Sequence, residues 1–153
     1  MKITKITDPN LKSEICNSIL RSLPLWFGLE HAIVDYVKDV ESMETWGVFE
    51  NDVAIGFASI NKHFAKSAEI HVIGIRQEYH RRGIGKQLVK LIEKDLRAEG
   101  VQFFTVKTLS ESKPNKEYDQ TRNFYLKAGF TPLEEFKTLW GEDNPCLLLV
   151  KNL

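Results

Sequence analysis

Tyr79 to Lys86, Y-H-R-R-G-I-G-K, is the stretch that decides the fold, because an apolar strand ends before it and an amphipathic helix begins inside it. The segment before the turn is apolar enough for a strand buried on both faces of a sheet. Apolar residues at helical spacing follow the turn until Gly100. The apolar residues before the turn are Ile70, Val72, Ile73 and Ile75. Those at helical spacing after the turn are Ile84, Leu88, Leu91, Ile92 and Leu96.

The turn has the composition of a cradle for an anion. Gly83 and Gly85 carry no Cβ, so a ligand can approach their backbone closely. The first N–H groups of the helix have no partner within it, and such a helix start attracts anions. Arg81, Arg82 and Lys86 add cationic side chains, which suit a pyrophosphate.

Other functions of this turn are less consistent with its spacing. A dinucleotide fingerprint would need a third glycine where Leu88 stands, and the G-x-x-x-x-G-K-[ST] loop of ATP-binding proteins is absent. An ordinary glycine-containing helix start with solvated basic residues is the structural alternative.

The pattern [QR]-x-x-G-x-[GA] on a strand-to-helix turn resembles motif A of the GNAT-type N-acetyltransferase superfamily. His80 stands at its first position, where Gln or Arg is usual. The resemblance implies that the pyrophosphate of acetyl-coenzyme A binds the turn, that its pantetheine arm follows the preceding strand, and that a backbone N–H near Ile73 stabilises the oxyanion. The residues expected to bind this cosubstrate are Ile73, Ile75, Arg81, Arg82, Gly83, Ile84, Gly85 and Lys86.

A second motif lies at residues 121–130, T-R-N-F-Y-L-K-A-G-F, and predicts a short helix capped by Gly129. It resembles the F-Y-x-x-x-G-F signature of the same superfamily. Helical spacing predicts Phe124 and Ala128 toward the core and Tyr125 on a neighbouring stripe. The resemblance implies that Tyr125 lies near the coenzyme A sulfur and acts as general acid toward the thiolate.

Acetyl transfer to an amine also needs a base, because an alkylammonium must lose a proton before it can attack. Glu69 is the candidate. It precedes Gly83 by fourteen positions (83 − 69), and the resemblance implies a base at this offset, as in the histone-acetyltransferase branch. His71, two residues further on, and water are left open as alternatives, and a solvent-facing glutamate is the structural alternative. The chemistry requires no metal.

The composition predicts one domain, residues 1–153, long enough to bury a core. Lys and Arg number 21, as do Asp and Glu, so there is no overall basic charge of the kind that drives nucleic-acid binding. No apolar run approaches the roughly 20 residues that cross a bilayer, and a signal-peptide core is absent. We therefore expect a cytoplasmic protein. Cys16, Cys146 and the scattered histidines indicate neither a disulfide framework nor a zinc site.

The remaining pattern predicts an α/β fold in which strands outnumber helices. The resemblance implies a single-domain, mixed, mostly antiparallel sheet of about six to seven strands flanked by about four helices. The expected strands are Lys2 to Thr7, Thr45 to Phe49, Val53 to Asn61, Glu69 to Ile75, Gln102 to Leu109, Phe130 to Thr138 and Cys146 to Val150. The expected helices run from Asp8 to Ser22, Leu29 to Val40, Ile84 to Gly100 and Tyr118 to Ala128.

Together the motifs predict an N-acetyltransferase that moves an acetyl group from acetyl-coenzyme A to a primary amine of a small molecule or peptide. Trp26, Trp46 and Trp140 are candidate acceptor contacts, although core or core-edge positions are favoured for at least two of them. A catalytically silent acyl-coenzyme A-binding regulatory module is the first alternative, and a nucleic-acid-binding module using Arg81 and Arg82 is the second. The acceptor, the acyl-chain preference and a homodimer are left open.

Overall fold

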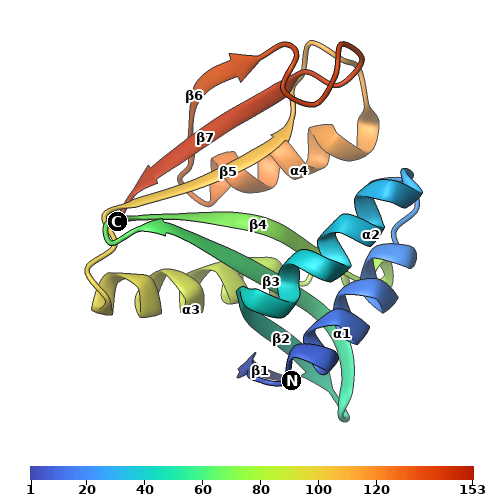
Figure 1. The fold of residues 1–153 in the computed structure, drawn as a ribbon, viewed down its shortest axis with the longest axis vertical. Coiled ribbons are helices and arrows are strands. Elements are labelled where there is room, and N and C mark those ends of the chain that lie inside the picture. Colours follow the sequence, from blue (N-terminus) through green and yellow to red (C-terminus); the bar gives the residue numbers. More distant parts are fainter. The chain divides into compact units, whose positions relative to one another are not determined.

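The computed structural model describes residues 1–153 and contains seven strands and four α-helices (Figure 1). The strands are β1 (Lys2–Ile6), β2 (Glu44–Glu50), β3 (Val53–Phe64), β4 (Ser67–Ile75), β5 (Phe103–Leu109), β6 (Thr131–Phe136) and β7 (Cys146–Asn152). The helices are α1 (Pro9–Arg21), α2 (Glu30–Asp39), α3 (Ile84–Ala98) and α4 (Lys116–Lys127), with 3-10 turns η1 (Val40–Ser42) and η2 (Gln77–Tyr79). Every expected strand and helix is therefore present. No helix combines the length and hydropathy that a membrane-spanning segment requires.

The seven strands form one sheet in the order β1-β2-β3-β4-β5-β7-β6. The pairs β1–β2, β2–β3, β5–β7 and β6–β7 are antiparallel. β4 and β5 pair in parallel, from Ser67 opposite Phe103 to Ile70 opposite Val106, which is the arrangement that a crossover helix such as α3 permits. The predicted mixed, mostly antiparallel sheet with four helices is confirmed.

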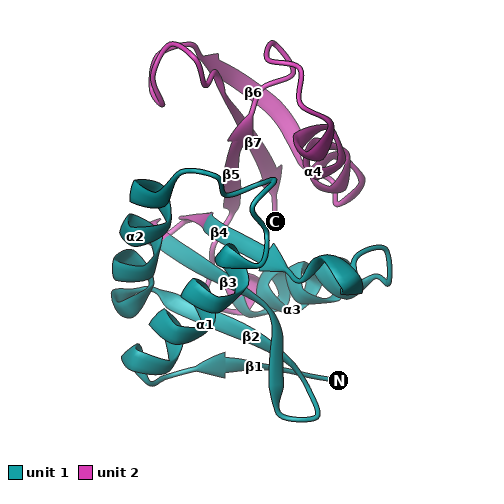
Figure 2. Ribbon diagram, turned by 90° about the vertical axis from the view of Figure 1, so that its right-hand side faces the viewer, with its two compact units in different colours: residues 1–61, 71–95 teal, residues 62–70, 96–153 magenta.

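The chain forms two compact units (Figure 2). The first consists of residues 1–61 and 71–95, and the second of residues 62–70 and 96–153. β4 contributes to both units, since its first residues pair with β5 and the rest belong to the first unit. The prediction that residues 1–153 are one domain stays a prediction.

In the first unit, α1 and α2 cover one face of the strands and α3 lies on the other (Figure 2). Asp8, where the expected helix begins, caps α1, because its Oδ1 accepts the N–H of Asn10 at 3.0 Å. Each fully buried aliphatic side chain of the resulting core contributes roughly 1.5–3 kcal/mol. The core cluster contains Ile6, Ile15, Cys16, Ile19, Leu20, Leu23, Ile33, Val40, Phe57 and Val72.

In the second unit, α4 packs its aromatic residues onto β5 and the end of the second motif. The ring of Phe130 lies 5.4 Å from that of Phe104 and 5.8 Å from that of Tyr125. The predicted core face of α4 is wrong in detail. Arg122 and Tyr125 are buried, whereas Phe124 and Ala128 are half-buried. The reason is a hydrogen bond that apolar spacing could not reveal, in which Arg122 Nη1 donates to the carbonyl of Leu109 at 2.6 Å.

Candidate functional site

The turn between β4 and α3 presents backbone N–H groups to an open space. Arg81 has φ +61° and Gly83 has φ +75°, so the chain makes a left-handed step just before the helix. The first helical bond runs from the N–H of Gln87 to the carbonyl of Gly83 at 3.1 Å, which leaves the N–H groups of the first turn without a helical partner. A Cβ built on Gly83 would meet no atom within 4 Å. The backbone at this helix start is therefore accessible to a ligand.

The charge around this turn is cationic and exposed. The side chains of Arg81, Arg82 and Lys86 all lie at the surface of the first unit. The guanidinium of Arg82 lies over the ring of Tyr79, 5.2 Å from the ring centre. This cation–π contact restricts the positions that the Arg82 side chain can adopt. A hydrogen bond to Glu50 raises the pKa of Tyr79 and connects the turn to the end of β2. The three cations together suit a polyanion such as a pyrophosphate.

His80 connects the turn to the end of β4, the strand that precedes it, by a hydrogen bond. Its Nε2 donates to the carbonyl of Ile75 at 2.6 Å, and its ring meets the ring of Trp26 edge to face at 5.4 Å. Nearby, Arg76 donates from Nε to the carbonyl of Ala54 at 3.1 Å and from Nη2 to Ser18 Oγ at 2.7 Å. The histidine that replaces the usual Gln or Arg of motif A thus has a positioning role that its place in the motif did not indicate.

Glu69 lies in the second unit and is not a solvent-facing glutamate. Its side chain is 8% exposed, its Oε1 accepts from His63 Nε2 at 2.7 Å, and its Oε2 accepts from Lys107 Nζ at 3.0 Å. Both oxygens therefore accept a hydrogen bond from another side chain of the second unit. His63 and Lys107 are functional candidates that the sequence did not single out.

We expect Lys107→Met to lower the free energy of unfolding by about 1–3 kcal/mol, because it leaves a buried carboxylate oxygen without its donor. The double variant Lys107→Met/Glu69→Gln should lose less than the sum of the two single variants, since the charge and its partner disappear together. Urea unfolding of the four proteins measures this coupling. Lys127→Met, at an exposed position of α4, is the control. Strict additivity of the two losses would show that the pair is not coupled.

His71 has a different partner from Glu69, although the two residues are close in sequence. In the first unit its Nε2 donates to Asp39 Oδ2 at 3.0 Å, and its ring meets the ring of Tyr36 at 5.3 Å. Asp39 is the last residue of α2, and 32 positions separate it from His71. No sequence pattern indicated this pair.

The remaining predicted residues lie on β4 and α4. Ile73 and Ile75 are half-buried at the end of β4. The carbonyl of Ile75 is the one that accepts from His80. In the second unit Tyr125 is only 3% exposed, and its ring contacts that of Phe124 at 5.5 Å. In the first unit, one strand-to-helix turn contains the predicted residues Ile75, Arg81, Arg82, Gly83, Ile84, Gly85 and Lys86. Of these, Ile84 is buried and Gly85 is half-buried at the start of α3.

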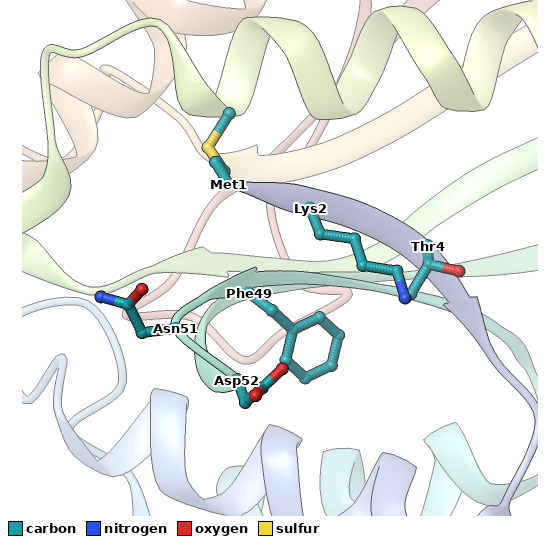
Figure 3. A pocket seen from close by; sticks show the side chains of 6 residues that line it. All are labelled: Met1, Lys2, Thr4, Phe49, Asn51 and Asp52. Carbon is teal, nitrogen blue, oxygen red and sulfur yellow. The ribbon is translucent and has the colours of Figure 1, made fainter.

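Two pockets of the structure are lined by residues other than the predicted ones. One of about 420 Å³ lies beside β1 and the β2–β3 turn, and Figure 3 shows the side chains that line it. They are Met1, Lys2, Thr4, Phe49, Asn51 and Asp52. A second pocket of about 320 Å³ lies between α4 and strands β6 and β7 of the second unit, where Arg122 pairs with Asp119. Neither pocket holds a group of the predicted acetyl-transfer chemistry.

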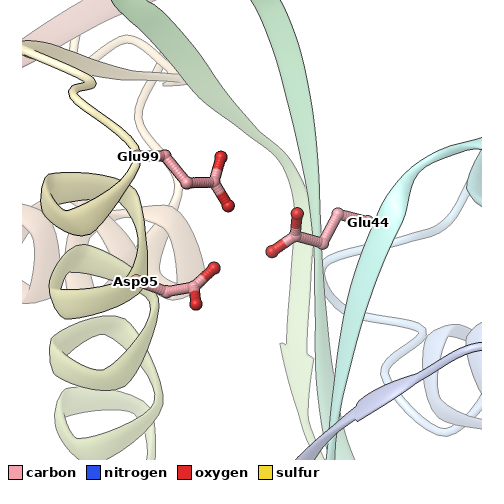
Figure 4. A group of neighbouring side chains, drawn as sticks. All are labelled: Glu44, Asp95 and Glu99. Atoms are coloured by element: carbon pink, nitrogen blue, oxygen red, sulfur yellow. The ribbon is translucent and has the colours of Figure 1, made fainter.

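Carboxylates gather at a third place, where Glu44 on β2 and Asp95 on α3 face each other (Figure 4). Lys5 Nζ lies 3.3 Å from Glu44 and 2.8 Å from Asp95. Glu99 pairs with Lys62 at 2.5 Å. Each of these carboxylates thus has a lysine partner, although Glu44 and Asp95 share Lys5, so the two lysines offset part of the charge of the three carboxylates.

The tryptophans are mostly structural, as expected. Trp46 is buried, Trp26 packs against the core cluster of the first unit, and Trp140 is exposed. At least two of the three therefore lie in the core or at its edge, and only Trp26 contacts a residue of the turn.

Comparison with known proteins identifies the class. The model of the acetyltransferase (GNAT) family matches residues 14–130, and the chain belongs to that family. A mycothiol acetyltransferase of Corynebacterium glutamicum (strain R) is 28% identical over 100 residues, which make up 65% of this chain and 31% of that protein. The match thus spans less than a third of this relative's length.

Two solved structures share the fold. An aminoglycoside 6'-N-acetyltransferase complexed with coenzyme A has a TM-score of 0.79 and 18% identity, and the match covers 99% of this chain and 97% of that one. The PaiA N-acetyltransferase of Thermoplasma acidophilum, also in complex with coenzyme A, has a TM-score of 0.75 and 18% identity over 100% of both chains. At this identity the likeness concerns the fold.

Proposed function

We propose that this chain transfers an acetyl group from acetyl-coenzyme A to a primary amine of a small molecule or peptide. The observation that carries the proposal is the left-handed step at Arg81 and Gly83, which opens the first turn of α3 toward a ligand. Membership of the acetyltransferase family supports it, as do the two structures of the same fold that contain coenzyme A.

The residues of the turn fit the pyrophosphate of coenzyme A. The accessible space above Gly83 admits phosphate oxygens to the N–H groups of the helix start. Arg81, Arg82 and Lys86 supply the charge that compensates the phosphates. Ile73 and Ile75 on β4 would lie along the pantetheine arm, with the backbone N–H near Ile73 as donor to the acetyl oxygen.

The bound cosubstrate supplies an acetyl group activated as a thioester. The phenol of Tyr125 is the proposed proton donor to the departing sulfur, since a phenol is protonated at neutral pH and can donate to a thiolate. Burial of Tyr125 among Phe124 and Phe130 limits its rotation and keeps water away from its ring. The proton acceptor for the ammonium group is Glu69 in the sequence-based proposal, with His71 as its competitor.

A thiol-release assay with a panel of amines tests the proposal. The panel contains alkyl polyamines, an aminoglycoside and short peptides with a free N-terminus or a lysine. We expect thiol release that depends on one amine class and on acetyl-coenzyme A. Binding of acetyl-coenzyme A without thiol release in the presence of any amine would favour the catalytically silent module instead.

We expect Arg82→Ala to raise the Kd of acetyl-coenzyme A about tenfold at low salt, because it removes a charge-assisted hydrogen bond to a phosphate. The effect should shrink as the salt concentration rises, because salt screens the attraction between Arg82 and the phosphate in the wild-type protein. Titration calorimetry at two ionic strengths measures it. Lys90→Ala, an exposed cation further along α3, is the matched control and should leave the Kd unchanged. Equal effects of the two variants would mean that only the general charge of the helix matters.

A further inference from the structure

The two candidate bases differ in what their own partners permit. Glu69 receives a hydrogen bond on each carboxylate oxygen, from His63 and from Lys107. Both carboxylate oxygens are thus already engaged by donors of the protein itself. Glu69 is therefore better suited to linking β3, β4 and β5 of its unit by hydrogen bonds than to accepting a proton from the substrate.

His71 has the opposite environment. Its Nε2–H donates to the carboxylate of Asp39, which assigns the ring proton to Nε2 and leaves the lone pair on Nδ1. The carboxylate orients the ring, so that Nδ1 is the nitrogen that can take up a proton. The side chain of His71 is 24% exposed, so it is shielded but still accessible.

We propose that His71, oriented by Asp39, is the proton acceptor that prepares the amine for acetyl transfer. His71 Nδ1 takes one proton from the ammonium group, and the freed nitrogen lone pair attacks the thioester carbonyl carbon. The C–N bond forms, the C–S bond breaks with its electron pair on sulfur, and the second amine proton ends on the thiol. The imidazolium then returns its proton to water. This inference rests on the proposed function.

The groups around the pair suit a cationic acceptor. Tyr36 and Phe27 form an aromatic row that reaches the ring of His71, with ring centres 6.0 Å and 5.3 Å apart. Aromatic rings beside a carboxylate attract an alkylammonium group. The thiol of Cys16, whose pKa burial and Asp39 raise to about 12, stays neutral. The carboxylate of Asp39 is the charged group of α2 that contacts His71, and the acceptor class is a primary alkylamine.

The test measures kcat/KM against pH with the best amine of the panel. At pH 7 we expect His71→Gln to lose about 100-fold, the usual contribution of a general base. Its rate should then rise about tenfold per pH unit and approach that of the wild type at about pH 9, because an amine with a pKa of about 10 increasingly deprotonates unaided there. Asp39→Asn should lose about tenfold with the same trend, as a positioning residue does. His31→Gln, an exposed histidine of α2, is the control.

Thermal stabilisation by acetyl-coenzyme A, measured on each variant, shows that the fold and the cosubstrate site are intact. A loss in His71→Gln that stays constant with pH, or no loss at all, would overturn the assignment. The same holds if Glu69→Gln shows the recovery at high pH instead. Acetyl-coenzyme A could stabilise the wild-type protein while no amine of the panel leads to thiol release. In that case the proposed function fails, and the assignment of His71 fails with it.

Discussion

Gly83→Val abolishes the thermal stabilisation that acetyl-coenzyme A gives the wild-type protein. A ligand at a hundredfold excess over its Kd stabilises the native state by about 2.7 kcal/mol. The valine side chain would occupy the open space above the helix start, and its Cβ disfavours the φ of +75° by roughly 1–2 kcal/mol. Both effects close the turn to a phosphate. Thermal unfolding with acetyl-coenzyme A, free coenzyme A, NADH and ATP in parallel measures the loss and the selectivity.

A matched variant separates the ligand effect from backbone strain. Gly100 follows α3, has φ +88°, and also has no atom within 4 Å of a built Cβ. Gly100→Val should therefore lower the unliganded melting temperature about as much as Gly83→Val does. It should keep the full stabilisation by both coenzyme A species. Equal stabilisation of the two variants would disprove the assignment of the turn, and stabilisation of wild type by ATP alone would point to another nucleotide.

The fold was largely predictable because its signals are local. Apolar runs indicated strands and spacing with a period of 3.6 indicated helices. Asp8 and Gly100 marked helix ends by capping chemistry that depends on a few neighbouring residues. The register that sets Ile70 opposite Val106 was not predictable, because it depends on packing across the sheet. The burial of Arg122 was missed for a related reason, since its partner is a carbonyl thirteen positions away.

Of the candidate site, only the part formed by consecutive residues could be predicted from the sequence. The turn from Arg81 to Lys86 combines glycine spacing, charge and a helix start within a few residues, so its composition alone indicates an anion site. The Asp39–His71 pair joins residues 32 positions apart, and neither residue has an unusual neighbourhood in the sequence. The same applies to Glu69, whose partner Lys107 lies 38 positions away. Polar pairs between residues so far apart in the sequence become visible only in the folded structure.

Tyr125→Phe lowers kcat by at least about 100-fold while leaving the Kd of acetyl-coenzyme A within about twofold, if Tyr125 is the general acid. Phenylalanine keeps the ring contacts with Phe124 and Phe130, so the variant removes the hydroxyl without opening the core of the second unit. Steady-state kinetics with thiol detection and calorimetric titration with acetyl-coenzyme A measure the two quantities. The selective loss of kcat follows because the hydroxyl is needed only when charge develops on sulfur.

Tyr118→Phe provides the control for this variant, since Tyr118 is half-buried on the same helix and loses the same atom. It should retain kcat within about threefold, because no proton transfer is assigned to it. An unchanged kcat in Tyr125→Phe would remove Tyr125 from the mechanism and leave water as the proton donor to sulfur. A loss of affinity with kcat unchanged would instead make the hydroxyl a binding group, because an interaction made equally in the ground state and in the transition state does not change kcat.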